Sequence, residues 1–94
     1  MDEATTSDGI TVFGAMWCGD TRRSLALLDG LGIEYAFVDV DLSQEASDWA
    51  AAQNGGKRRI PVIVVAPGQP ILIEPSDLEL SAALQEAGLA PAIA

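Results

Sequence analysis

Four consecutive β-branched residues follow a proline in the second half of the chain: Val62, Ile63, Val64 and Val65 after Pro61. An unbroken apolar run of this length is typical of a strand that is buried on both faces. A chain of 94 residues has room for one core, so the sheet that holds this strand needs helices on both sides. The run therefore predicts an α/β protein with a small, doubly covered sheet.

The hydrophobic periodicity and the turn residues predict the rest of the fold. The predicted strands cover residues 10–15, 33–40, 61–66 and 70–73, and the predicted helices cover residues 19–31, 43–53 and 76–87. The first strand, helix and strand form a crossover unit, so these two strands should be parallel. The short turn at residues 67–69 predicts that the last two strands form an antiparallel hairpin.

The resulting order is β-α-β-α-β-β-α, which predicts a thioredoxin-like fold with a four-stranded mixed sheet flanked by three helices. We expect residues 1–94 to form one domain, with residues 1–8 as a flexible tail. Asp39 and Asp41 end the second strand, where they are expected to serve turn chemistry. Trp49 is expected to lie in the core on the second helix.

Cys18 is the only cysteine of the chain, and it lies between the predicted strand 10–15 and the predicted helix 19–31. A thiol at the start of a helix faces free backbone N–H groups and the positive end of the helix dipole. This setting favours the thiolate, which is the reactive form. The alternative is that Cys18 is a small buried hydrophobic residue, as free cysteines usually are.

The neighbours of Cys18 limit its chemistry. Asp20 opposes the thiolate, whereas Arg22 and Arg23 favour it. Threonine stands at position 21, where a second cysteine would complete a C-x-x-C motif. The sequence therefore predicts one-thiol redox chemistry, or what remains of it.

Composition excludes several other classes of function. The chain has no histidine, so a Cys-His pair and a Ser-His-Asp triad are impossible. One cysteine allows neither an intrachain disulfide nor an all-cysteine metal site in the monomer. The net charge of −9 argues against nucleic acid and anionic membranes as partners. A free thiol and an acidic N-terminus without a basic region predict a cytoplasmic protein.

All five basic residues fall in two clusters, Arg22-Arg23 after the cysteine and Lys57-Arg58-Arg59 before Pro61. One interpretation is that they are two solvated turns. The other is one positive site built from two distant segments, which requires a fold that joins them.

Three segments carry a resemblance to a known family: Trp17-Cys18-Gly19-Asp20-Thr21, residues 54–61 and residues 74–77. Together they resemble the glutaredoxins, in particular the small actinobacterial glutaredoxin-like proteins that include mycoredoxin. The resemblance covers about residues 10–87. The chain departs from the family pattern at Thr21, which replaces a second cysteine, and at Arg59, where a small hydroxyl residue is common.

The resemblance implies a set of site residues. Cys18 is the expected nucleophile, with Trp17 placed to shield one side of it and Gly19, Asp20 and Thr21 completing the motif. Small-thiol binding is implied for Arg58, Arg59, Ile60, Pro61, Ser76 and Asp77. Within this set Pro61 is the expected cis-proline, Ile60 offers its backbone N–H and C=O, and the Ser76-Asp77 turn holds the γ-glutamyl end of glutathione. The alternatives are that Pro61 only starts a strand and that Ser76 only caps a helix.

The resemblance therefore predicts a monothiol oxidoreductase that reduces mixed disulfides between proteins and a small thiol, glutathione or mycothiol. We expect a monomer without a tightly bound cofactor, with thiolated proteins as clients. One alternative is a [2Fe-2S] cluster held between two subunits by Cys18 of each and two small thiols. Others are an inactive adaptor with this fold and, from the order Cys18-Gly19-Asp20-Thr21-Arg22, an arsenate-reductase-like protein.

Overall fold

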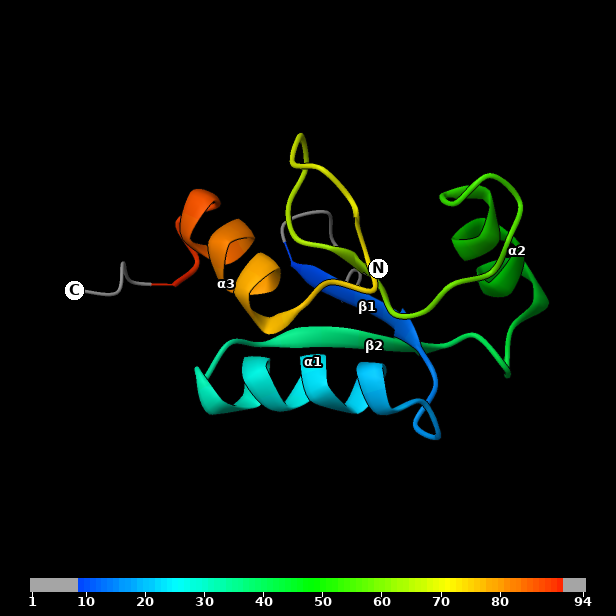
Figure 1. Cartoon of the computed structure of the whole chain (residues 1–94), viewed down its shortest axis with the longest axis horizontal. Helices are drawn as coiled ribbons and strands as arrows, with labels where there is room; N and C mark the ends of the chain where they lie inside the picture. Colours follow the sequence, from blue (N-terminus) through cyan, green and yellow to red (C-terminus); the bar gives the residue numbers. More distant parts are fainter. Residues whose placement is uncertain (1–8, 91–94) are drawn as a thin grey trace.

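The computed structural model describes residues 9–90, so the tail expected over residues 1–8 lies outside the described residues. The elements occur in the predicted order (Figure 1): β1 (Ile10–Gly14), α1 (Gly19–Gly30), β2 (Tyr35–Asp39), α2 (Gln44–Ala52), β3 (Val62–Val64), β4 (Leu72–Ile73) and α3 (Asp77–Glu86). Within the described part of the chain, no helix is both long enough and apolar enough to cross a membrane.

The four strands form one mixed sheet in the order β2-β1-β3-β4. β1 is parallel to β2 and antiparallel to β3, and β3 is antiparallel to β4. This arrangement confirms the predicted four-stranded mixed sheet with three helices, a thioredoxin-like α/β fold.

The predicted tight hairpin between the last two strands is wrong in its length. β3 and β4 pair only through Val62 with Ile73 and Ile63 with Leu72, so seven residues, 65–71, connect them. Pro67 and Pro70 lie in this connection and have no backbone N–H to extend the ladder. The two strands are therefore shorter than predicted.

Local sequence signals begin the second and third helices as predicted. The Ser43 hydroxyl accepts a hydrogen bond from the Ala46 backbone N–H at 3.1 Å at the start of α2. Ser76 and Glu79 form a reciprocal capping box at the start of α3. α1 is different, because its N-cap residue is Cys18 and no side chain caps the helix.

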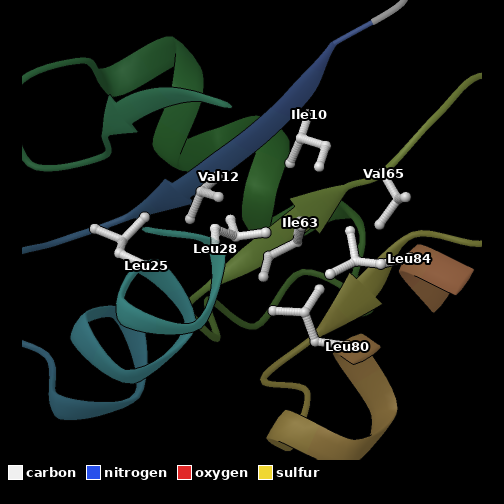
Figure 2. Close-up of a cluster of buried hydrophobic side chains, with 8 residues drawn as sticks. All are labelled: Ile10, Val12, Leu25, Leu28, Ile63, Val65, Leu80 and Leu84. Carbon is white, nitrogen blue, oxygen red and sulfur yellow. The ribbon is translucent and has the colours of Figure 1, made fainter. Parts of the chain in front are cut away.

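The larger core lies between one face of the sheet and the helices α1 and α3. Figure 2 shows its side chains converging from the strands and from both helices. Its buried members are Ile10, Val12, Leu25, Leu28, Ile63, Val65, Leu80 and Leu84. All are aliphatic, so burial of this face removes a continuous apolar surface from water.

A second, smaller core covers the other face of the sheet beneath α2. It contains Ala15, Val40, Ala46, Ala50, Ile60 and Val62. Ile63 and the adjacent Val62 are both fully buried, one in each core, so the prediction of a strand buried on both faces is confirmed. The expectation that Trp49 lies in the core is wrong: its side chain is 36% exposed. Trp49 packs on Phe13, which is itself packed against this core, with ring centroids 4.6 Å apart.

Candidate thiol site

Cys18 follows β1, is half-buried and is the N-cap residue of α1. The Cys18 backbone N–H donates to the Ala15 carbonyl at 3.0 Å, and its own carbonyl accepts from the Arg22 N–H at 3.1 Å, the first hydrogen bond of the helix. The Cys18 side chain caps none of the first-turn N–H groups. These groups therefore stay available to a thiolate or to a substrate atom beside it.

The loop before β3 comes directly to this thiol. The Cys18 Sγ lies 3.9 Å from the Ile60 carbonyl oxygen and can donate a weak hydrogen bond to it. The Ile60–Pro61 peptide bond is cis, as the resemblance implies. Ile60 is buried and Pro61 is fully buried, and the Ile60 carbonyl is the polar group of this loop that the sulfur contacts.

Thr21, which replaces a second cysteine, is a fully buried packing residue. Its Oγ1 accepts a hydrogen bond from the Ala15 N–H at 3.4 Å. It also lies against Gly14, where an added Cβ would come within 2.5 Å of the same oxygen. Glycine at position 14 thus leaves room for a branched residue at position 21, which has no redox chemistry to offer Cys18.

Arg23 joins the start of α1 to the start of α3. Its guanidinium contacts Asp20 at 2.8 Å and Asp77 at 3.5 Å, and it donates to the Pro75 carbonyl at 3.0 Å. The Ser76-Asp77 turn is therefore held next to the first turn of the helix that carries Cys18.

The arginines of the loop before Pro61 are also paired with carboxylates. Arg58 contacts Asp41 at 2.9 Å, and Arg59 contacts Glu74 at 3.1 Å. Arg22 instead donates to the Met16 carbonyl at 2.7 Å. Three of the five basic residues, Arg23, Arg58 and Arg59, are thus matched by carboxylates, and no local pattern in the sequence predicts this pairing.

Trp17 is 67% exposed beside Cys18. Its indole N–H donates to the Asp41 carboxylate at 2.6 Å. Asp41 lies in a turn in which its backbone N–H donates to the Asp39 carboxylate at 2.9 Å, as the turn prediction requires. The role of Asp41 as a shared partner was missed, because Trp17 and Arg58 lie 24 and 17 residues away and no local pattern links them.

The Asp41 carboxylate is the acidic group that these contacts perturb. The hydrogen bond from Trp17 and then that from Arg58 lower the pKa of Asp41 below its usual value of 3.8. Asp41 therefore carries its negative charge throughout the neutral range. Over residues 9–90, no group of three or more Cys, Asp or Glu side chains is arranged to hold a metal ion.

This combination of a cysteine at the N-cap position of a helix, a cis-proline loop and a doubly covered mixed sheet defines a thiol protein of the thioredoxin fold. Residues 10–71 match the family model described as Glutaredoxin, and the chain belongs to the glutaredoxin family. Its single cysteine makes it a monothiol member.

Relatives and solved structures agree with this assignment. Mycoredoxin 1 from Corynebacterium glutamicum is 36% identical over 59 residues, which cover 63% of this chain and 72% of the relative. The glutaredoxin from Archaeoglobus fulgidus shares the fold with a TM-score of 0.71 at 15% identity, over 90% of this chain and 97% of that chain. A buckwheat glutaredoxin in complex with glutathione has a TM-score of 0.62 at 26% identity, over 90% of this chain and 84% of that chain.

Proposed function

We propose that this protein is a monothiol glutaredoxin-like oxidoreductase that reduces mixed disulfides between proteins and a low-molecular-weight thiol, with Cys18 as the nucleophile. The observation that carries the proposal is the position of Cys18 at the start of α1, 3.9 Å from the Ile60 carbonyl beside Pro61. The membership in the glutaredoxin family supports the same class of chemistry.

The reaction proceeds in two thiol–disulfide exchanges. The Cys18 thiolate attacks the small-thiol sulfur of the mixed disulfide, the disulfide bond breaks, and the protein leaves as a thiolate that takes up a proton. Cys18 then carries the small thiol in a new disulfide. A second small-thiol molecule attacks this disulfide as its thiolate, which releases the Cys18 thiolate and the oxidised, dimeric small thiol. One free small thiol is consumed for each mixed disulfide that is reduced, and its sulfur pairs with the sulfur that came from the mixed disulfide, so the electrons balance.

Thr21 determines the stoichiometry of this mechanism. A second cysteine at this position could attack the Cys18 disulfide from within the protein, but the Thr21 hydroxyl cannot. The second exchange therefore depends on the concentration of free small thiol. In this mechanism the free N–H groups of the first turn of α1 stabilise the attacking thiolate. The proposed role of the Ile60 backbone is to pair with the peptide groups of the small thiol, and its carbonyl lies 3.9 Å from the sulfur.

The small thiol remains one of two candidates. The buckwheat glutaredoxin was solved with glutathione, and the relative from Corynebacterium is named a mycoredoxin, which points to mycothiol. The parts of the small thiol other than its sulfur are proposed to contact Arg58, Arg59, Ser76 and Asp77. Because Arg59 is paired with Glu74 and Asp77 with Arg23, an anionic thiol has to compete with carboxylates already in place.

The test is turnover of one peptide mixed disulfide, prepared with glutathione and with mycothiol, each with its own thiol and recycling enzyme. We expect turnover with at least one pair, a rate proportional to free small thiol, and complete loss in Cys18→Ser. Background rates with both pairs would overturn the proposal and favour the inactive adaptor. A brown protein after anaerobic purification, with sulfide and iron in equal amounts, would instead favour the bridged [2Fe-2S] cluster.

A further inference from the structure

One carboxylate, that of Asp41, connects the two segments that meet at the thiol. Its Oδ2 accepts the Trp17 indole N–H at 2.6 Å, and its Oδ1 accepts from the Arg58 guanidinium at 2.9 Å. Trp17 directly precedes Cys18, and Arg58 lies two residues before Ile60. The carboxylate thus joins the segment of the sulfur to the segment of the carbonyl that lies 3.9 Å from it.

We propose that Asp41 is a positioning residue, whose carboxylate holds the Trp17 indole and the Arg58 guanidinium in fixed places beside Cys18 and so sets the approach of substrates to the thiol. The proposal rests on the proposed function for its catalytic consequence. The positioning itself does not depend on turnover and is measured separately below.

Most of the Trp17 side chain is in solvent, so packing alone does not fix the orientation of its ring. An indole that is 67% exposed has little packing to select one rotamer. Its single donor, the N–H, is used in the short hydrogen bond to Asp41. A hydrogen bond to an ionised acceptor is stronger than one to a neutral acceptor, so this contact is the one that restrains the ring next to the thiol.

Asp41 is itself held in place for this role. Its backbone N–H donates to the Asp39 side chain at 2.9 Å, and Leu42, the next residue, donates its N–H to the Asp39 carbonyl at 3.1 Å. On the other side, Arg58 also reaches Ser47 on α2 at 3.3 Å. The Asp41 carboxylate therefore lies between a turn that hydrogen bonds from backbone N–H groups stabilise and a guanidinium that also contacts Ser47 on α2.

The first experiment observes Trp17 directly in the full chain. In a Trp49→Phe background Trp17 is the only tryptophan, so its fluorescence anisotropy and its quenching by acrylamide report the mobility and access of this ring. We expect Asp41→Ala to lower the anisotropy and to raise the quenching constant roughly twofold. A twofold change is the effect expected from the loss of one exposed, charged contact. Asp41→Asn, which keeps an acceptor oxygen for the indole, should recover much of the anchoring.

The matched control is Glu34→Ala, which removes the same charge from an exposed residue before β2 without a hydrogen bond or ion pair to another side chain of residues 9–90. It should leave the Trp17 signals unchanged. Circular dichroism and urea unfolding of each variant verify that it is folded; if Asp41→Ala does not fold, Asp41→Ser, which also removes the carboxylate, takes its place in the same measurements.

The second experiment measures kinetics with the mixed-disulfide substrate. We expect Asp41→Ala to raise KM roughly two- to fivefold, with a smaller change in kcat, because substrate approach and not the exchange step is altered. Trp17→Phe keeps an aromatic ring but removes the indole N–H, so the effects of Asp41→Ala and Trp17→Phe on KM should be less than additive in the double variant. Two results together would overturn the positioning role: the wild type turns over the substrate, and Asp41→Ala matches Glu34→Ala in both the Trp17 fluorescence and the KM. A wild type without turnover would refute the proposed function, while the fluorescence result still decides the positioning.

Discussion

The Cys18 sulfur lies 3.9 Å from the Ile60 carbonyl oxygen, although 42 residues separate the two in the chain. Antiparallel pairing of β1 with β3 places Phe13 opposite Val62, so the end of β1 and the start of β3 lie at the same edge of the sheet. The loop that follows β1 carries Cys18, and the loop that precedes β3 carries Ile60. Sheet topology, and not any local signal, therefore brings the thiol to the proline loop.

Asp20→Asn should make Cys18 more reactive. The Asp20 carboxylate lies two residues from the sulfur and is paired with Arg23 at 2.8 Å. Removal of this negative charge favours the neighbouring thiolate, so we expect the rate of alkylation by iodoacetamide at neutral pH to rise roughly twofold at low salt. Glu34→Gln makes the same charge change at a distance and serves as the control. An unchanged rate in Asp20→Asn would show that the Asp20 charge does not act on Cys18, and a slower rate would show that Asp20 acts mainly by orienting Arg23.

Gly14→Ala should destabilise the protein through Thr21. The added Cβ would lie 2.5 Å from the Thr21 Oγ1 and 2.7 Å from its Cγ2, and Thr21 is fully buried at the start of α1 and cannot move away. We expect a loss of about 1–3 kcal/mol in the free energy of unfolding, measured in urea.

The matched test of that cause is the double variant Gly14→Ala with Thr21→Ala. Truncation of Thr21 removes both clashing atoms and leaves only its Cβ, at 3.2 Å. The two single losses should therefore add to more than the loss in the double variant. Strict additivity would mean that the cost at position 14 arises elsewhere.

Glu74→Gln should change the response to anionic small thiols. In the wild type the Glu74 carboxylate pairs with Arg59 at 3.1 Å, so the pair as a whole has little net charge to attract an anionic ligand. With glutamine the guanidinium charge becomes available, and we expect KM for a glutathione mixed disulfide to fall roughly twofold in dilute buffer. The gain should shrink at high salt because exposed charges are screened.

Replacement of Arg58 and Arg59 by alanine is the opposite change. It should weaken the same binding at low salt, but only slightly in the wild-type background, because Asp41 and Glu74 already occupy these arginines. The loss of ligand binding on Arg59→Ala should be larger in the Glu74→Gln background than in the wild type. Equal losses in both backgrounds would show that the Arg59–Glu74 pair does not limit ligand binding.

Asp41 should stabilise the folded protein at pH values above the pKa of its carboxyl group and not at lower pH. Hydrogen bonds from Trp17 and Arg58 lower the pKa of Asp41 in the folded protein from the usual 3.8. A carboxyl whose pKa is depressed by folding stabilises the folded state above its unfolded pKa and loses this contribution as pH falls through the folded pKa. The Tm difference between the wild type and Asp41→Asn should thus be constant from about pH 5 to pH 7 and disappear in more acid solution. A difference that persists at pH 2 would assign the effect to packing and not to charge.

Most of the architecture could be predicted because its signals are local. The Ser43 cap and the Ser76–Glu79 capping box each act within four residues, and their helices begin where predicted. The connection between β3 and β4 was predicted too short, because a turn signal at residues 67–69 says nothing about where cross-strand pairing stops. Trp49 was placed too deep, because its helix covers the sheet with alanines, Ala46 and Ala50, and the indole reaches only Phe13 at the edge.

The sequence by itself determined the order of the elements, the strand buried on both faces and the place of the one cysteine at a strand-to-helix junction. These follow from hydrophobic periodicity, capping residues and turn residues, which act between near neighbours in the chain. Only the tertiary structure decided which charges meet: Arg58 with Asp41, Arg59 with Glu74, and Arg23 with Asp77. Five basic residues among fourteen acidic ones leave many possible pairs, and each exposed pair is too weak to choose its own partner. The strand order and the packing of α1 against α3 chose the partners instead, and with them the contacts that surround Cys18.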